Sequence, residues 1–284
     1  AHNFFLGLCS IVATTNYGSR MSHSSSRRCC STGDTSALSR VRGAYTATTI
    51  AEYFRDQGKN VMLLFDSVTR LAMSQREIGL SVGEPPATRG YTPSVFTMLP
   101  KLLERSGTSD KGTITGVYTI LVEGDDMDEP ITDAVRGILD GHIVLSRRLA
   151  EKYHYPAVDV LGSVSRLEDK IMPLRLRKNA GYIRKLLAMY TEKEDLISVG
   201  AYARGSNPLV DEAIGKIDDI NGFLQQEIEE KAELKNTLKS AGVICGDILT
   251  DEDLEHLDRM DKRDVKDSAL KDKDLRDETI SIHA

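Results

Sequence analysis

Five apolar residues in a row, from Val61 to Phe65, are followed directly by the acidic Asp66. A short hydrophobic run without alternation predicts a strand that is buried on both faces of a parallel sheet. Asp66 then stands at the carboxyl edge of the sheet, where open α/β sheets bind ligands. A hydrophobic strand that ends in Asp also occurs in many α/β proteins without such a site, so the rest of the chain has to decide between the two interpretations.

Helical periodicity flanks this strand on both sides. Between Val41 and Gly58, apolar or small groups recur with the spacing of one helix face, and a glycine ends the pattern. A second helix is predicted from Ser67 to Leu80 and a third from Ser94 to Arg105, with further strands at Thr113 to Val122 and Gly141 to Leu145. Helices that alternate with buried strands predict a doubly wound α/β sheet.

Two loops between these elements carry charged groups. The segment from Ser81 to Phe96 is rich in proline and glycine and has Arg89 at its centre, which is typical either of a functional loop or of a rigid surface connection. The acidic segment from Glu123 to Glu129 lacks the ligand spacing and the glycine of a calcium loop. It is therefore interpreted as a solvated loop that caps the next helix at Thr132.

The two ends of the chain differ from this central pattern. Phe4 to Ala13 is apolar but too short to span a bilayer, and no basic residues precede it as in a signal peptide. Thr14 to Cys30 has no periodicity, which raises the hypothesis of an interrupted coding sequence. A long helix is predicted from Asp211 to Lys239. Asp251 to Arg276 alternates acids and bases, as in a solvated helix or a disordered tail, with an interaction role as the alternative.

Composition narrows the class of protein. The 284 residues are 40% hydrophobic, which is enough for a substantial core. With 37 basic and 43 acidic residues the net charge is -6, so no overall basic surface indicates a nucleic-acid partner. The four cysteines have neither the spacing of metal ligands nor that of a disulfide framework, which favours a reducing cytosol.

Candidate chemistry lies at two strand ends. Asp66 is placed to hold Mg²⁺ through water, and Arg70 follows one helical turn later, either beside the same ligand or as a simple ion-pair partner of Asp66. The segment Tyr155 to Arg166, with sequence YPAVDVLGSVSR, is a predicted strand that ends in a guanidinium. A planar, permanently charged group suits a phosphate that gains charge in a transition state. Asp159 is interpreted as a structural hydrogen-bond acceptor.

Three segments carry a family resemblance: YPAVDVLGSVSR, VMLLFDSVTR and PPATRGYTPSVF. Together they resemble the alpha and beta subunits of rotary ATP synthases. From about Ser36 to Gln226 the chain is more similar to the ATPase that drives type III protein export, in its flagellar or virulence form. The acidic rotor-contact loop of the synthase beta subunit is not visible between Tyr190 and Asp211, which favours export over an ATP synthase beta-type fragment.

The resemblance implies an α/β fold of the RecA-like P-loop NTPase type, with an incomplete, mostly parallel sheet followed by a small α-helical domain. It implies four regions: 1–35 unassigned, 36–173 a partial nucleotide-binding core, 174–240 the helical domain, and 241–284 a charged tail. The implied cofactors are ATP and Mg²⁺. The implied partners are further copies in a homo-hexamer, stalk and regulator proteins of the export apparatus, chaperones and export substrates, all in the cytoplasm at the inner membrane.

The resemblance also implies a role for individual residues. Asp66 matches the Walker B magnesium ligand, and Arg70 matches a neighbour of the reacting phosphate. Arg166 matches the arginine finger that reaches the nucleotide of the adjacent subunit. Tyr155 matches the aromatic residue that stacks on adenine, and Phe223 is expected to close the other side of that pocket.

One part of the family pattern is missing. No G-x-x-x-x-G-K-S/T run occurs in the 284 residues, although its backbone amides and Lys hold the phosphates. The GER segment with the glutamate that activates water, and the amino-terminal barrel, are not found either. We therefore expect a truncated or frame-disrupted copy that is inactive alone. The alternative to an ATPase subunit is a non-catalytic module that supplies an arginine finger and a docking surface.

Overall fold

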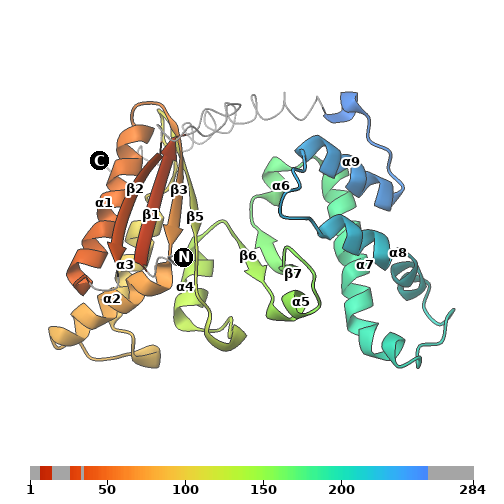
Figure 1. Cartoon of the computed structure of the whole chain (residues 1–284), viewed down its shortest axis with the longest axis horizontal. Helices are drawn as coiled ribbons and strands as arrows, with labels where there is room; N and C mark the ends of the chain where they lie inside the picture. Colours follow the sequence, from red (N-terminus) through yellow and green to blue (C-terminus); the bar gives the residue numbers. More distant parts are fainter. Residues whose placement is uncertain (1–6, 15–25, 33–34, 255–284) are drawn as a thin grey trace, which may run out of the picture. The chain divides into compact units, whose positions relative to one another are not determined.

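The computed structural model describes residues 7–14, 26–32 and 35–254 (Figure 1). The chain falls into two compact units, Ala1–Leu139 and Asp140–Ala284, and each is described by itself. No helix in the described part of the chain is long and apolar enough to cross a membrane.

The described strands of the first unit form one mixed sheet. They are β1 (Gly7–Thr14), β2 (Ser26–Thr32), β3 (Asn60–Asp66), β4 (Gly107–Thr108) and β5 (Thr113–Tyr118), in the spatial order β2-β1-β3-β5-β4. Among these strands only β3 and β5 pair in parallel, and the other three pairs are antiparallel. The sheet is therefore mixed rather than mostly parallel, because β1, β2 and β4 all run against their neighbours.

The strands β1 and β2 correct an expectation about the start of the chain. No periodicity was visible from Thr14 to Cys30, yet β2 lies largely within this stretch and β1 includes residues 7–13 of the apolar run. Backbone pairing places Cys9 opposite Asp66 and also opposite Cys30, so β1 lies between β2 and β3. Residues 1–6, 15–25 and 33–34 lie outside the described part.

In the described part of this unit, one α-helix precedes β3 in the sequence, and three follow it. They are α1 (Ala37–Arg55), α2 (Val68–Ser81), α3 (Pro93–Leu103) and α4 (Pro130–Ile138). Serine side chains begin the first two: Ser36 Oγ accepts a hydrogen bond from the backbone N–H of Ser39, and Ser67 Oγ accepts one from that of Arg70. The first three helices confirm the helices predicted from the hydrophobic pattern.

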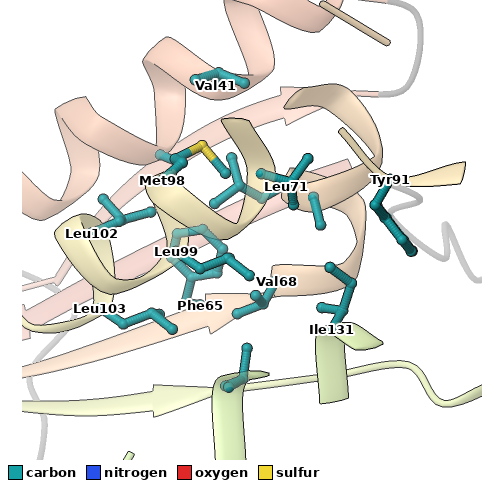
Figure 2. Packing of buried hydrophobic residues seen from close by; sticks show 14 residues of the cluster. Val41, Phe65, Val68, Leu71, Tyr91, Met98, Leu99, Leu102, Leu103 and Ile131 are labelled. Carbon is teal, nitrogen blue, oxygen red and sulfur yellow. The ribbon is translucent and has the colours of Figure 1, made fainter. Parts of the chain in front are cut away.

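The core lies on one face of the sheet. Val61, Leu63 and Phe65 are almost completely buried, whereas Met62 and Leu64 on the opposite face are only partly buried. Phe65 belongs to a buried cluster with residues from all four helices of this unit, among them Leu71 of α2 and Leu99 of α3 (Figure 2). The expectation of a strand fully buried on both faces is therefore wrong, because these helices pack on one side only.

The acidic loop differs from its predicted form in two respects. Its Asp126 carboxylate lies 2.5 Å from the guanidinium of Arg89, so the two charged loops are joined by an ion pair. The cap position of α4 is Glu129 rather than Thr132, and both residues are buried. Glu129 Oε1 accepts a long hydrogen bond of 3.5 Å from Tyr91 Oη. The end of this loop is thus packed rather than solvated.

The second unit combines a hairpin and a helical bundle. Strands β6 (Gly141–Leu145) and β7 (Val158–Ser165) pair in the antiparallel direction. The helices are α5 (Arg147–Glu151), α6 (Glu168–Ile171), α7 (Leu174–Ser198), α8 (Pro208–Leu224) and α9 (Leu234–Cys245). Side chains of α7 and α8, including Ile183, Leu186, Ala213 and Ile220, form the core of the bundle.

The helix predicted from Asp211 to Lys239 is wrong as a single element. Helix α8 ends at Leu224, and α9 begins only at Leu234. The backbone N–H of Gln226 donates a 2.9 Å hydrogen bond to the carbonyl of Tyr155, which replaces a continuing helical bond. In the predicted tail, Leu254 is 2% exposed, so the start of that stretch is packed. Residues 255–284 lie outside the described part.

Candidate functional site

The carboxylate of Asp66 lies at the carboxyl end of β3, as its position in the sequence predicts. It is exposed, and β5 runs parallel beside it. Thr119 Oγ1 donates a 2.7 Å hydrogen bond to Asp66 Oδ1, and no hydrogen bond to Oδ2 is found among the described residues. An accessible carboxylate oxygen at this edge fits an ion that prefers hard oxygen ligands.

Backbone and side-chain hydrogen bonds connect the turn after β3 to the segment after β5. The N–H of Val68 donates to the carbonyl of Thr119, and the N–H of Thr119 donates to the carbonyl of Phe65, each at 2.9 Å. Thr69 Oγ1 accepts from the N–H of Leu121 at 2.9 Å and lies 3.3 Å from its carbonyl. The peptide bond between Asp66 and Ser67 is cis. The surroundings of Asp66 are thus held from both strands.

Arg70 lies in the first turn of α2 and is partly buried. Its backbone N–H donates to Ser67 Oγ, and its carbonyl accepts a 2.8 Å hydrogen bond from Ser74 Oγ. Within the described residues no ion pair joins the Arg70 guanidinium to the Asp66 carboxylate. The simple ion-pair interpretation of Arg70 is therefore wrong.

Arg166 directly follows β7 in the second unit, and its side chain is exposed. Its backbone N–H donates a 2.8 Å hydrogen bond to the carbonyl of Asp140, which fixes the end of the strand. Asp159 Oδ1 accepts from the backbone N–H groups of Leu161 and Gly162 at 3.0 and 2.9 Å. The interpretation of Asp159 as a structural acceptor is confirmed.

Tyr155 and Phe223 come from distant parts of the sequence to the same end of the second unit. The carbonyl of Tyr155 accepts the hydrogen bond from Gln226, three residues beyond Phe223. Tyr155 is 49% exposed, and Tyr153 approaches it edge-on with the ring centroids 5.7 Å apart. Phe223 is partly buried against the helical core. The loop before β7 and the end of α8 are thus adjacent.

The electrostatics of the two charged loops agree with their geometry. The Arg89 guanidinium donates to Asp126, which lowers the pKa of that carboxyl and raises the pKa of Arg89. In the loop that contains Arg89, hydrogen bonds from Ser94 and Thr92 lower the pKa of Glu84. Both carboxylates are therefore held in the charged form.

A complete metal site is not present within the described residues, because no group of three or more His, Cys, Asp or Glu is close enough to hold an ion. Magnesium often binds proteins through one or two carboxylates and takes its other ligands from water and substrate phosphates. Asp66 alone fits this pattern. Thr119 was missed in the sequence, since the predicted strand ran through it to Val122. The signal that was available is a hydroxyl residue at the end of the neighbouring strand.

Two sequence profiles match the chain. The profile described as ATP synthase alpha/beta family, nucleotide-binding domain, matches residues 14–165, and the profile described as T3SS EscN ATPase C-terminal domain matches residues 174–240. The first match begins earlier than Ser36, where the resemblance was expected to start. The expected starting point was therefore too late.

Similar proteins come from flagellar and secretion systems. The chain is 57% identical over 215 residues to the flagellum-specific ATP synthase of Treponema pallidum (strain Nichols), covering 76% of this chain and 48% of the relative. It is 51% identical over 210 residues to the type 3 secretion system ATPase of Xanthomonas euvesicatoria, covering 74% and 48%. The chain spans about half the length of the curated relatives that it matches.

Solved structures confirm the RecA-like α/β class. The assembled ATPase EscN from the enteropathogenic E. coli type III secretion system aligns with a TM-score of 0.73 at 48% identity, covering 75% of this chain and 52% of EscN. The ATP synthase subunit NeqB from Nanoarcheaum equitans aligns with a TM-score of 0.69 at 28% identity, covering 76% and 55%. Because the nucleotide-binding profile covers more than half of the chain and the secretion-type profile follows it, the chain belongs to the ATP synthase alpha/beta family, in the branch of the type III secretion and flagellar export ATPases.

Proposed function

We propose that this chain is part of a subunit of the ATPase that energises type III protein export, flagellar or virulence. The observation that carries the proposal is the 57% identity to a flagellum-specific ATP synthase over 215 residues, together with an exposed Asp66 at the end of its parallel strand. In this assignment residues 14–165 belong to the nucleotide-binding core and residues 174–240 form the helical domain. Residues 241–284 are assigned to neither.

Asp66 holds Mg²⁺ through its exposed carboxylate, directly or through water. When bound, the ion neutralises charge on the phosphates of ATP. Arg70 lies in the first turn of α2, four residues after Asp66, and adds a permanent positive charge near this end of β3. These two residues therefore attract and orient the phosphates on the subunit that binds the nucleotide.

Arg166 acts on the nucleotide of the adjacent copy in a homo-hexamer. Its exposed side chain at the end of β7 supports this role, because an arginine finger has to leave its own protomer. Tyr155 and Phe223 hold the adenine ring of the chain's own nucleotide. The half-exposed Tyr155 ring and its link to the end of α8 support this assignment.

The alternative function is a non-catalytic module that supplies Arg166 and the helical docking surface to another subunit. The exposed position of Arg166 at the end of β7 supports this alternative as well. Assembled EscN, and EscN in complex with its central stalk EscO, support assembly and a stalk partner for either function. The further proposed partners are regulators, chaperones and export substrates, and the proposed location is the cytoplasmic face of the inner membrane.

The experiment that tests the proposal supplies Arg166 in trans. The full chain is mixed with a flagellum-specific ATP synthase whose own arginine finger has been replaced by Ala, and ATP hydrolysis is measured. Wild-type chain is expected to restore turnover, Arg166→Ala is expected to lose this effect, and the exposed Arg204→Ala serves as the matched control. No restoration by the wild-type chain, or equal restoration by Arg166→Ala, overturns the role of Arg166.

The same measurement on the chain alone separates the two functions. Magnesium-dependent turnover that disappears in Arg166→Ala shows a self-sufficient ATPase and excludes the non-catalytic module. Turnover only in the mixture shows that this chain acts through a partner that binds the phosphates.

A further inference from the structure

Thr119 connects the two parallel strands at the candidate metal site. We infer that Thr119 is a positioning residue, which orients the Asp66 carboxylate toward the metal ion by holding its Oδ1 atom. This inference rests on the magnesium role proposed for Asp66, and it adds a residue outside the sequence motifs to that site.

Three polar groups of Thr119 contact the turn that carries Asp66. Its hydroxyl donates to Asp66 Oδ1 at 2.7 Å, and its backbone N–H donates to the Phe65 carbonyl at 2.9 Å. Its carbonyl accepts from the Val68 N–H, also at 2.9 Å. Phe65, Asp66 and Val68 are thus all held by the residue that directly follows β5, which fixes the Thr119 hydroxyl relative to the Asp66 backbone.

The hydroxyl contact restricts a side chain that is otherwise exposed. An Asp side chain at an exposed strand end is free to rotate, and each metal-binding event then has to select one orientation. A hydrogen bond to Oδ1 removes part of this freedom and leaves Oδ2, which has no hydrogen-bond partner among the described residues, available to a ligand. Loss of such a partner of a metal ligand typically weakens metal binding about 10- to 100-fold. Because Asp66 and Thr119 are both exposed and water competes, we expect about tenfold, the lower end of this range.

A purely structural role for Thr119 predicts a different result. At the other end of the same strand pair, Thr113 Oγ1 donates a 3.0 Å hydrogen bond to Asn60 Oδ1, also at an exposed position. This pair has the same chemistry between the same strands but lies far from the carboxyl edge. Thr113 is therefore the matched control for any general effect on the pairing of β3 with β5.

The experiment measures Mn²⁺ binding at Asp66, with Mn²⁺ in place of Mg²⁺. Paramagnetic broadening of the Asp66 carboxyl carbon resonance is titrated by NMR in the full chain, and Asp66→Asn identifies the resonance. Thr119→Val and Thr119→Ala remove the hydroxyl, Thr119→Ser keeps it, and Thr113→Val is the control. We expect about tenfold weaker binding for Thr119→Val and Thr119→Ala, and wild-type affinity for Thr119→Ser and Thr113→Val. Thermal unfolding of each variant gives its stability in parallel.

The possible outcomes separate the magnesium role of Asp66 from the positioning role of Thr119. If Mn²⁺ does not broaden the Asp66 resonance of the wild-type chain, the magnesium role is wrong. If the wild type binds and both hydroxyl-free variants bind equally well, Asp66 is a ligand but Thr119 does not position it. If Thr113→Val weakens binding as much as Thr119→Val, or Thr119→Ser does not restore it, the effect is general destabilisation and the inference is overturned. The Ala variant gives the same test without an added methyl group if Thr119→Val does not fold.

Discussion

Arg105, which follows α3, joins that part of the first unit to α1. Its Nε donates to Glu52 Oε1 at 2.9 Å, and its Nη2 lies 2.5 Å from Glu52 Oε2. Nη2 also donates to Thr49 Oγ1 at 2.9 Å, and the guanidinium lies 5.8 Å from the ring centroid of Tyr45. We predict that replacing either partner of the Arg105–Glu52 pair destabilises the fold by more than an ordinary surface ion pair does.

The magnitude follows from the geometry and the burial of the pair. Exposed ion pairs contribute about 0.2–1 kcal/mol, whereas hydrogen bonds to charged groups contribute about 1.5–3 kcal/mol. The Arg105 and Glu52 side chains are 24% and 23% exposed, and the contact is bidentate. The expected coupling free energy is therefore about 1.5 kcal/mol, at the lower end of the range for hydrogen bonds to charged groups and above the range for exposed ion pairs.

A double-mutant cycle measures this coupling. The variants are Glu52→Gln, Arg105→Gln and the double variant, and urea unfolding is followed by far-UV circular dichroism because the chain has no Trp. The matched control is the Arg40–Glu77 pair, which joins α1 to α2 through a single 3.0 Å contact with Glu77 63% exposed. Its expected coupling is below about 0.5 kcal/mol.

The coupling also has a predicted pH dependence. The hydrogen bonds from Arg105 lower the pKa of Glu52 in the folded protein, while the unfolded chain keeps the ordinary value of roughly 4.3. A carboxyl whose pKa is lowered on folding stabilises the protein fully above its unfolded pKa, and this stability is lost as the pH falls through the folded pKa. A coupling no larger than that of Arg40–Glu77, or one that is unchanged at about pH 2, contradicts the reasoning.

Two further predictions use matched pairs. Leu99→Ala is expected to lower the free energy of unfolding by about 2–5 kcal/mol because Leu99 is fully buried, whereas Leu38→Ala, at a half-exposed position, costs less than about 1 kcal/mol in urea unfolding; equal losses refute this. Gly79→Ala is expected to destabilise α2, since a Cβ there lies 2.4 Å from Thr92 Oγ1, while Gly215→Ala in α8 meets nothing within 4 Å and gains about 0.5–1 kcal/mol of helix stability. Opposite shifts of the unfolding midpoint confirm this prediction, and a midpoint raised by Gly79→Ala contradicts it.

Local patterns in the sequence were sufficient to predict the secondary structure around Asp66 and to assign the family. The run before Asp66 predicted β3, and helical spacing predicted α1, α2 and α3 close to their observed bounds. Such patterns report the surroundings of one segment at a time. The motif segments are equally local, because each is contiguous in the sequence, and they are sufficient to place the chain among the export ATPases.

Only the tertiary structure decided what meets Asp66. The Thr119 hydroxyl that binds its carboxylate comes from 53 positions later in the sequence, and the pairing of β1 with β3 joins segments with no shared pattern. The end of α8 was likewise set by a hydrogen bond from Gln226 to Tyr155 rather than by any change in local periodicity. Hydrogen bonds between distant residues depend on how the chain folds back on itself, and periodicity along one segment contains no information about that.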